Sequence, residues 1–342
     1  MALSWGLVGA SNVAETRMVR ALQAIGDRVV AVQSADAQRG SDFALRNRIA
    51  RSTTSVDELL DSGIDAVYVS SKNEFHHDHA LRSLRAGKHV LCEKPLALNV
   101  ADAEDLIDVA AAGSLVLATN HHLPGSPLHV AARRLVSEGR IGRVLSARVH
   151  HAVSLPEHLR GWRLAGSTPG SGVVMDITCH DASVLNPLLG TPLTVVALGV
   201  SQLGANQLGH NQHQQAAVDA AMTVIEYRSP TGDRILAQTH DAFTVAFDRT
   251  SLEIQGESGS ILVLDAMTQD ARGSLLLSTV AGQVEIEVDT SADLYQIILE
   301  AFGAAVDGRG APTATGADGL LALKVAMAAE ASIQTGAACR VD

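Results

Sequence analysis

The chain has 342 residues, of which 46% are hydrophobic and 18% are charged, a composition typical of globular rather than disordered proteins. Its length predicts two domains, or one large one, with a sizeable core. The formal net charge of −11 and the lack of a lysine and arginine cluster argue against binding DNA or RNA through phosphates.

The first third of the chain alternates short apolar runs with segments of helical spacing. Strands are predicted at residues 3–8, 28–33, 66–70, 89–92 and 115–119, and helices at residues 13–24, 42–48, 56–60, 77–86 and 101–112. Strands separated by short helices are typical of βαβ units, whose right-handed crossovers build a doubly wound parallel sheet. We therefore expect an N-terminal dinucleotide-binding domain of the Rossmann type over residues 1–122.

The pattern changes after residue 122. Helices are predicted at residues 128–138, 172–189, 294–305 and 317–333, and strands at residues 143–152, 194–200, 217–227, 234–241, 251–255, 260–264, 274–280 and 283–287. Glycine and polar turns between the strands favour hairpins. We expect residues 123–342 to form a substrate-binding α+β domain with a large open, mainly antiparallel sheet. The Gln- and Asn-rich stretch 203–215 is interpreted as a loop.

The three cysteines, Cys92, Cys179 and Cys339, lie far apart in the sequence. Their odd number and wide spacing argue against a disulfide framework and favour a reducing compartment. The N-terminus shows no signal-peptide pattern, and no apolar run approaches the roughly 18 residues of a membrane span. We expect a cytoplasmic protein that acts on a small molecule, without a membrane or nucleic-acid partner.

The opening stretch SWGLVGASNVAETRMVRAL, residues 4–22, reads as strand, turn and helix. The three glycine positions of the dinucleotide-binding motif G-x-G-x-x-G carry Gly9, Ser11 and Ala14. Gly9 suits the tight turn, Ser11 is small and has a hydroxyl that can donate to a pyrophosphate, and Ala14 permits close helix packing. Amide groups at the helix start would face the phosphates. The alternative is a plain strand-to-helix turn.

The end of the second strand bears on the choice between NAD and NADP. NAD sites usually place Asp or Glu there to bind the ribose 2′-hydroxyl, but this chain has Ser34, followed by Ala35 and, five residues after Ser34, Arg39. A hydroxyl and a guanidinium suit a 2′-phosphate, so NADP(H) is favoured as cofactor. Asp36 is the opposing observation, because a carboxylate turned inward would repel the phosphate.

Three further segments carry a recognisable pattern. They are Glu93-Lys94-Pro95 after a predicted strand, Ser70-Ser71-Lys72-Asn73 after the preceding strand, and the helical segment DITCHD at residues 176–181. Together with the opening stretch they resemble the glucose-fructose oxidoreductase / inositol dehydrogenase family over nearly the whole chain. The resemblance implies oxidation or reduction of sugars and related carbonyl compounds with NAD(P).

Further stretches narrow this resemblance to family members that reduce 1,5-anhydro-D-fructose with NADPH. They are WGLVGAS, YVSSKNEFH, AGKHVLCEKPLAL, ATNHHL, EGRIGR, GWRL and DITCHDA. The implied reaction is hydride transfer to the C2 carbonyl, which gives 1,5-anhydro-D-mannitol. Departures at residues 201–216 and 265–290 leave the sugar specificity open.

The resemblance assigns catalysis to Lys94, Asp176 and His180. Asp176 and His180 stand four residues apart, so they share one helix face. Lys94 follows a parallel strand, at the edge where open α/β sheets bind ligands. A carbonyl that accepts hydride needs a proton and nearby positive charge. In our hypothesis His180 donates the proton, Lys94 polarises the carbonyl, and Asp176 orients the substrate or the imidazole; Lys94 and His180 could exchange roles.

The remaining site residues follow from the resemblance alone. Those along the pyrophosphate are Ala10, Ser11, Asn12 and Val13; those at the cofactor edge are Ser71, Lys72, Asn73, Glu74, Phe75 and His76; Glu93 and Lys94 lie near the nicotinamide; Asn120, Trp162, Arg163 and Tyr295 complete the cofactor site; and His121 and His122 face the substrate.

Several alternatives remain open at this point. Histidine clusters at residues 76–79, 121–122 and 150–151 suggest metal ligands, but no cysteine pairs accompany them and adjacent histidines rarely meet on one ion, so no metal is expected. Another sugar or an inositol could be the substrate, or the chain could be a non-catalytic NAD(P)-binding regulator. The oligomeric state is open between a monomer and a homo-oligomer formed through the C-terminal sheet.

Overall fold

The computed structural model describes residues 2–166, 168–203 and 217–342, so most of the predicted loop at 203–215 lies outside the described residues. Contacts between Cα atoms divide the chain into two compact units. The first unit contains residues 1–122 and 292–320, and the second contains residues 123–291 and 321–342. The second unit therefore differs from the continuous segment 123–342 that the sequence suggested.

A six-stranded parallel sheet forms the centre of the first unit's described part, with strand order β3-β2-β1-β4-β5-β6. Its strands are β1 Ser4–Val8, β2 Arg28–Gln33, β3 Arg51–Thr53, β4 Ala66–Val69, β5 His89–Cys92 and β6 Leu117–Thr119. β4 is buried at every position, as expected for a parallel strand covered on both faces. The doubly wound sheet predicted from the alternating pattern is confirmed, and only the short β3 was missed.

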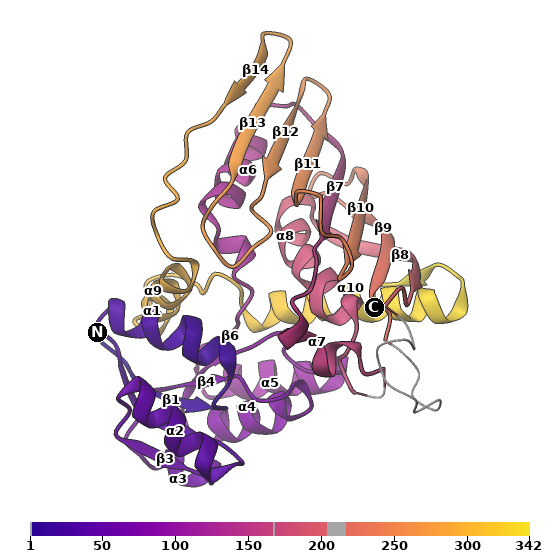
Figure 1. Cartoon of the computed structure of the whole chain (residues 1–342). Coiled ribbons are helices and arrows are strands. Elements are labelled where there is room, and N and C mark those ends of the chain that lie inside the picture. The colour runs from indigo at the N-terminus through magenta and orange to yellow at the C-terminus, as the bar shows by residue number, and fades with distance from the viewer. Residues whose placement is uncertain (1, 167, 204–216) are drawn as a thin grey trace. The chain divides into compact units, whose positions relative to one another are not determined.

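Helices follow most of these strands (Figure 1). They are η1 Ala14–Met18, α1 Val19–Ala24, α2 Ala37–Asn47, α3 Val56–Leu60, η2 Asn73–Phe75, α4 His76–Arg85, α5 Val100–Ala112 and α9 Leu294–Val306. α2 begins five residues before its predicted start, because Asp36 caps it by accepting the Arg39 N–H over 3.0 Å. The predicted helix 13–24 divides into the π-helical η1 and the α-helical α1.

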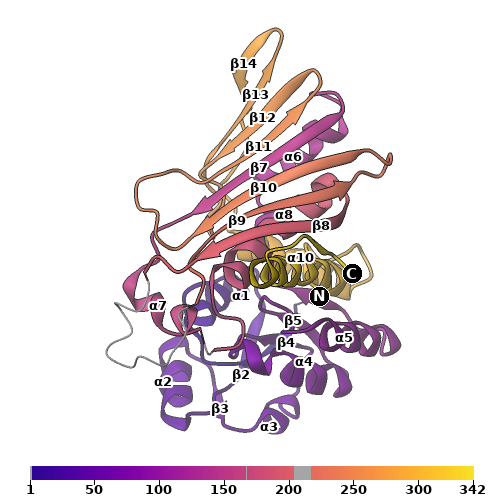
Figure 2. The same ribbon diagram turned by 90° about the vertical axis from the view of Figure 1, so that its right-hand side faces the viewer.

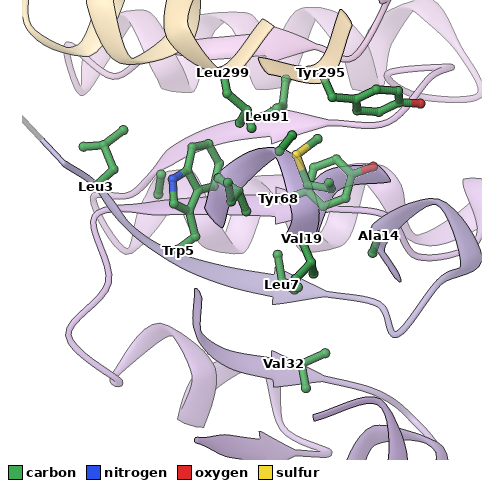
Figure 3. Close-up of a cluster of buried hydrophobic side chains, with 14 of the residues drawn as sticks. Leu3, Trp5, Leu7, Ala14, Val19, Val32, Tyr68, Leu91, Tyr295 and Leu299 are labelled. Carbon is green, nitrogen blue, oxygen red and sulfur yellow. The ribbon is translucent and has the colours of Figure 1, made fainter. Parts of the chain in front are cut away.

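The core of the first unit explains why residues 292–320 belong to it. Tyr295, Leu299 and Phe302 of α9 are at most 1% exposed and pack with Trp5 of β1 and Tyr68 of β4. The Trp5 and Phe302 rings lie 5.1 Å apart between centroids. Figure 3 shows Tyr295 and Leu299 on the same side of the sheet as Trp5. The apolar face of α9 is buried against the parallel sheet, and this burial stabilises the helix.

A nine-stranded sheet forms the described part of the second unit, with strand order β14-β13-β12-β11-β7-β10-β9-β8-β15. Its strands are β7 Val144–Ala152, β8 Thr191–Val200, β9 Ala220–Arg228, β10 Arg234–Ala242, β11 Ser251–Gly256, β12 Gly259–Leu264, β13 Ser274–Thr279, β14 Gly282–Glu285 and β15 Cys339–Arg340. β7 runs parallel to β10, and the other neighbours are antiparallel. The sheet is therefore mainly antiparallel, as predicted, although hairpins do not account for β7, which lies between β10 and β11.

The helices of the second unit are α6 Pro127–Ser137, α7 Glu157–Leu164, α8 Cys179–Leu189 and, across the boundary of the units, α10 Gly316–Thr335, with the short turns η3 Leu123–Gly125 and η4 Val174–Thr178. α6 and α8 cover one face of the nine-stranded sheet (Figure 2). α7 was not predicted, because its eight residues include Gly161 and lack a clear apolar stripe. No helix within the described ranges is long and apolar enough to cross a membrane.

Large apolar side chains are also exposed on several strands of this sheet. Val196 and Leu198 of β8, Met222 and Val224 of β9, and Leu236 of β10 are 45% to 74% exposed. Their neighbours in sequence on these strands, such as Ala197 and Ala237, are buried, as alternation in a half-covered sheet requires.

The packing of α9 can be tested by truncating one side chain. Phe302→Ala should lower the free energy of unfolding by about 3–5 kcal/mol, because it removes a fully buried ring and leaves a cavity. Urea denaturation followed by circular dichroism measures this loss. Leu45→Ala, at a side chain that is 81% exposed, should change stability by less than about 0.5 kcal/mol. Equal effects of the two substitutions would contradict the assignment of α9 to this core.

Candidate active site

The turn after β1 requires glycine at its first position. Gly9 has φ +111°, a region that other residues rarely adopt. A Cβ atom at Gly9 would lie 2.8 Å from the backbone of Ser70 and of Ser71, which follow β4. The two loops therefore approach each other backbone to backbone, a contact that the sequence analysis did not predict, while the positive φ fits the tight turn expected at Gly9.

The Ser11 hydroxyl holds this turn together. Ser11 Oγ accepts the Ala14 N–H over 3.1 Å and donates to Ser70 Oγ over 2.8 Å, and Ser70 Oγ in turn donates to the Gly9 carbonyl over 3.2 Å. We expected this hydroxyl to donate to a pyrophosphate, but in the structure it donates its proton to Ser70. Ala14 is fully buried, which agrees with its predicted role in close packing. Ala10 and Val13 are partly buried beside Ser11, and Asn12 is exposed.

The end of β2 brings Ser34 and Arg39 together. Arg39 Nε donates to Ser34 Oγ over 3.1 Å, and the Ser34 side chain is 1% exposed. This bond uses one of the guanidinium donors and leaves the terminal NH groups for other partners. Asp36 accepts the Arg39 backbone N–H as the cap of α2, so its carboxylate is used at the helix start. Ala35 lies exposed between them.

Glu93 organises the carboxyl edge of the parallel sheet. Its Oε1 atom accepts the Tyr68 hydroxyl over 2.5 Å and the Asn120 amide over 2.6 Å, and its Oε2 atom accepts the Lys94 backbone N–H over 3.3 Å. Burial, followed by the negative charge of Glu93, raises the pKa of Tyr68 well above its usual value. Lys94 thus leaves β5 on a backbone held by side chains from β4 and from the residue after β6.

His121 lies within the electrostatic reach of Lys94. Burial and then the Lys94 charge lower the pKa of His121 to about 3, so its imidazole is neutral at physiological pH. The next residue, His122, stacks on Tyr295 with centroids 5.9 Å apart, and Tyr295 belongs to the core described above. The structure therefore groups Lys94, Asn120 and His121 at one edge and places Tyr295 in the hydrophobic packing beneath His122.

His76 joins the two loops of this edge. Its Nδ1 atom lies 2.7 Å from the Pro95 carbonyl and its Nε2 atom 3.1 Å from the Ser71 carbonyl. Burial lowers its pKa, so the neutral ring donates to one of these carbonyls. The segment between Ser71 and His76 is more exposed: Lys72, Glu74 and Phe75 face solvent, and Asn73 is partly buried.

In the second unit, the candidate Asp176 binds Arg163. Arg163 Nε donates to Asp176 Oδ2 over 2.8 Å, and the guanidinium carbon lies 4.6 Å from the centroid of the Trp162 ring. Asp176 lies on the π-helical turn η4 and His180 on α8, and each is 7% exposed. The structure therefore brings Trp162, Arg163 and Asp176 together, and it buries His180 on the same continuous helix as Asp176.

A buried acidic network beside His180 was missed by the sequence analysis. His151 Nδ1 lies 2.7 Å from Asp181 Oδ1, and His151 is in register with Asp241 of the neighbouring strand; the Asp181 and Asp241 side chains are both fully buried. Asp181 was quoted only as part of the DITCHD motif, and His151 only as half of a histidine pair. The signal that could have found the network is Asp241, a charged residue at the end of the apolar strand β10.

In the portion of the chain that the structure describes, no three His, Cys, Asp or Glu residues are grouped so that they could hold a metal ion. His150 pairs with His240 on the other side of the sheet strand from His151, with ring centroids 4.9 Å apart, and lies 3.3 Å from Asp248.

Comparison with known proteins covers both units. The family model described as an oxidoreductase family with an NAD-binding Rossmann fold matches residues 3–121, and the GFO/IDH/MocA C-terminal domain matches residues 129–262. The chain is 41% identical over 340 residues to 1,5-anhydro-D-fructose reductase from Ensifer adhaerens. This alignment covers 99% of this chain and 98% of that relative.

Two more distant relatives differ in the cofactor that their names carry. A D-xylose 1-dehydrogenase (NADP(+)) from Haloferax volcanii is 26% identical, with 99% of this chain and 100% of the relative covered. The solved structure of levoglucosan dehydrogenase with NADH and levoglucosan has a TM-score of 0.86 and 21% identity, with 100% of both chains covered, and shows the shared fold. From both family models and the full-length relative, the chain belongs to the GFO/IDH/MocA oxidoreductase family, which binds NAD(P) on a Rossmann fold.

Proposed function

We propose that this protein is an NADPH-dependent reductase of a keto sugar, with 1,5-anhydro-D-fructose as its substrate and 1,5-anhydro-D-mannitol as its product. The observation that carries the choice of substrate is the 41% identity, over nearly the full length of both chains, to a relative with that activity. The candidate groups Lys94, Asp176 and His180 are all present, which favours an enzyme over a non-catalytic regulator.

The described geometry fits a dinucleotide. Gly9 allows the backbone of residues 9–13 to come close to a pyrophosphate, and the first amide groups of the following helix supply donors. Ser34 and Arg39 supply a hydroxyl and a guanidinium for the 2′-phosphate, which supports NADP over NAD. Asp36 weakens this preference less than its charge suggests, because its carboxylate caps α2.

The proposed chemistry divides between the two units. A nicotinamide cofactor, when bound, supplies the hydride. The carbonyl oxygen then gains negative charge and takes up a proton. His180 donates that proton, and the ammonium of Lys94 polarises the carbonyl; the alternative in which Lys94 donates the proton uses the same two groups. Asp176, held by Arg163, orients the sugar hydroxyls or the imidazole.

The other candidate residues have supporting roles in this proposal. His76 and Glu93 fix the backbone around Lys94, and Asn120 shares the Glu93 carboxylate. His121, which burial and the Lys94 charge keep neutral, and His122 line the sugar side of the edge. The proposed division of labour gives cofactor binding to residues 1–122 and substrate binding to the second unit. The oligomeric state, monomer or homo-oligomer through the sheet, and the cytoplasmic location stay predictions.

The catalytic assignment is tested by NADPH oxidation with 1,5-anhydro-D-fructose, beside a panel of other keto sugars and inositols. Lys94→Ala and His180→Ala should each lower kcat by about 10²- to 10⁴-fold, the usual contribution of a positioned acid or cation. Lys88→Ala is the matched control, because Lys88 lies at the opposite end of β5 and donates to the Ile64 carbonyl over 2.8 Å.

The results of these assays distinguish the proposed reductase from a regulator and from an enzyme with another substrate. Turnover that survives both substitutions would remove Lys94 and His180 from the mechanism. NADPH binding without turnover on the whole panel would favour the regulator, whereas turnover on another sugar or an inositol would keep the enzyme and change its substrate.

The cofactor corner makes a separate prediction. Arg39→Ala should reduce the preference for NADPH over NADH, measured as the ratio of kcat/KM values, by about tenfold to a hundredfold, which is the worth of a hydrogen bond to a charged group. Arg46→Ala on the same helix should leave that ratio unchanged, because Arg46 pairs with Glu15. An unchanged ratio in Arg39→Ala would place the 2′-phosphate elsewhere.

A further inference from the structure

Two carboxyl groups lie buried close to each other inside the second unit. Asp181 of α8 and Asp241 of β10 are both fully buried, and His151, which contacts Asp181, lies in register with Asp241 on the neighbouring strand. Among the described residues, Asp181 Oδ2 and Asp241 Oδ1 are buried without a hydrogen-bond partner. Ionised carboxylates only accept hydrogen bonds, and two buried negative charges this close would repel strongly. A single proton held between the two acids would supply the missing donor and remove one of the charges.

The remaining contacts supply hydrogen-bond donors to one oxygen of each aspartate. Asp181 Oδ1 lies 2.7 Å from His151 Nδ1, a ring nitrogen that can donate to a carboxylate. Asp241 Oδ2 accepts hydroxyl protons from Thr178 over 2.6 Å and from Thr239 over 2.9 Å, whereas its other oxygen, Oδ1, is buried without a hydrogen-bond partner in the described part of the chain. Burial raises the pKa of Asp181 to about 7, whereas burial and the charge of Asp181 hold the pKa of Asp241 well above its usual range.

The pair is connected to the proposed proton donor through His151. The His151 and His180 rings lie 6.5 Å apart between centroids, at an interplanar angle of 48°. An N–H bond from His151 Nδ1 to a carboxylate fixes the tautomer and the orientation of that ring. His180 also directly precedes Asp181 on α8. The carboxylate that binds His151 therefore belongs to the residue next to the proposed proton donor.

Other titratable groups lie near the network on the elements packed around it. On α6, burial lowers the pKa of His129 to about 4, and burial also lowers the pKa of Arg133. On β9, Tyr227 has its pKa raised by burial and by the charge of Asp181, and its hydroxyl donates to Asn186. Asp176 on η4 pairs with Arg163. With Tyr227 and His129 both neutral at physiological pH, the charge next to His151 is that of the acidic pair.

We propose that Asp181 and Asp241 share one proton, and that their single negative charge holds His151 and, through it, the imidazole of His180 in position for proton donation. Asp181, Asp241 and His151 are thus positioning residues. The link to proton donation rests on the proposed function, but the shared proton does not.

The shared proton is tested without any activity measurement. The infrared spectrum at neutral pH should contain the carbonyl bands of buried protonated carboxyl groups, and Asp241→Asn should remove the component that belongs to the acidic pair, whereas Glu330→Gln should leave that component in place. The amide of the Asp241→Asn variant mimics the protonated acid, because its NH₂ donates to Asp181 and its oxygen accepts from the threonines. Glu330→Gln is the matched control, since burial raises the pKa of Glu330 to about 7 in the same unit outside this network. An unchanged band in Asp241→Asn would overturn the shared proton.

The stability of the protein gives a second readout of the same proton. A carboxyl whose pKa is raised on folding is stabilising only at low pH, because the unfolded chain releases its proton at about pH 4 while the folded one retains it. The free energy of unfolding of the wild type should therefore fall between about pH 5 and pH 8. Asp241→Asn should flatten this fall by more than Glu330→Gln does. Equal slopes in wild type and Asp241→Asn would contradict the proposal.

The positioning role is tested by comparing the two aspartates. Asp241→Asn should keep kcat within about threefold, while Asp181→Asn, which removes the charge, should lower kcat by at least about tenfold and shift its pH profile with little change in KM. A purely structural role would lower stability without moving the pH profile. If Asp181→Asn does not fold, His151→Asn retains a donor to Asp181 and removes the ring, and the same loss is expected.

Nuclear magnetic resonance distinguishes a failure of the proposed function from a failure of the positioning role. The titration midpoint of the His180 ring should move in Asp181→Asn and stay in Asp241→Asn, whether or not any sugar is reduced. An unmoved His180 midpoint in Asp181→Asn would overturn the positioning role. A moved midpoint in a protein that turns over none of the sugars would retain the network and reject only the proposed reaction.

Discussion

The carboxylate of Glu93 is the constraint on which the first half of the candidate site depends. In a parallel sheet, all strands end at one edge, and here the ends of β4, β5 and β6 are joined by side-chain bonds from Tyr68 and Asn120 to this one group. The same group accepts the Lys94 N–H, so the lysine departs from a fixed backbone.

Two of the stretches that sequence patterns marked as functional contain a π-helical turn. One is η1, directly after the glycine turn, and the other is η4, which carries Asp176 just before His180. π-helical turns are rare and concentrate at functional sites, because the wider turn changes the direction of side chains and backbone groups. Hydrophobic periodicity does not reveal such turns over only five residues. The spacing argument from Asp176 to His180 assumed an α-helix throughout, whereas Asp176 lies on the π-helical turn η4 and His180 on α8, which continues it.

Features that depend on local pattern were predictable from the sequence, and features that depend on distant contacts were not. The parallel sheet, the glycine at position 9 and the meeting of Ser34 with Arg39 follow from residues close in the chain. The membership of α9 in the first unit depends on Phe302 packing against Trp5 across almost the whole sequence. Likewise, the parallel pairing of β7 with β10 brings His151 into register with Asp241, a contact that no local pattern encodes.

The two units satisfy their acidic side chains in opposite ways. Glu93 accepts hydrogen bonds from the neutral donors of Tyr68 and Asn120 and from the Lys94 backbone N–H. Asp181 and Asp241 have too few donors for two charges, so one of them keeps its proton and the pair bears a single charge. Each arrangement is less favourable for folding than an apolar core of the same volume would be. Because each lies directly behind a group assigned to the reaction, their placement is better explained by the orientation of Lys94 and His180 than by stability.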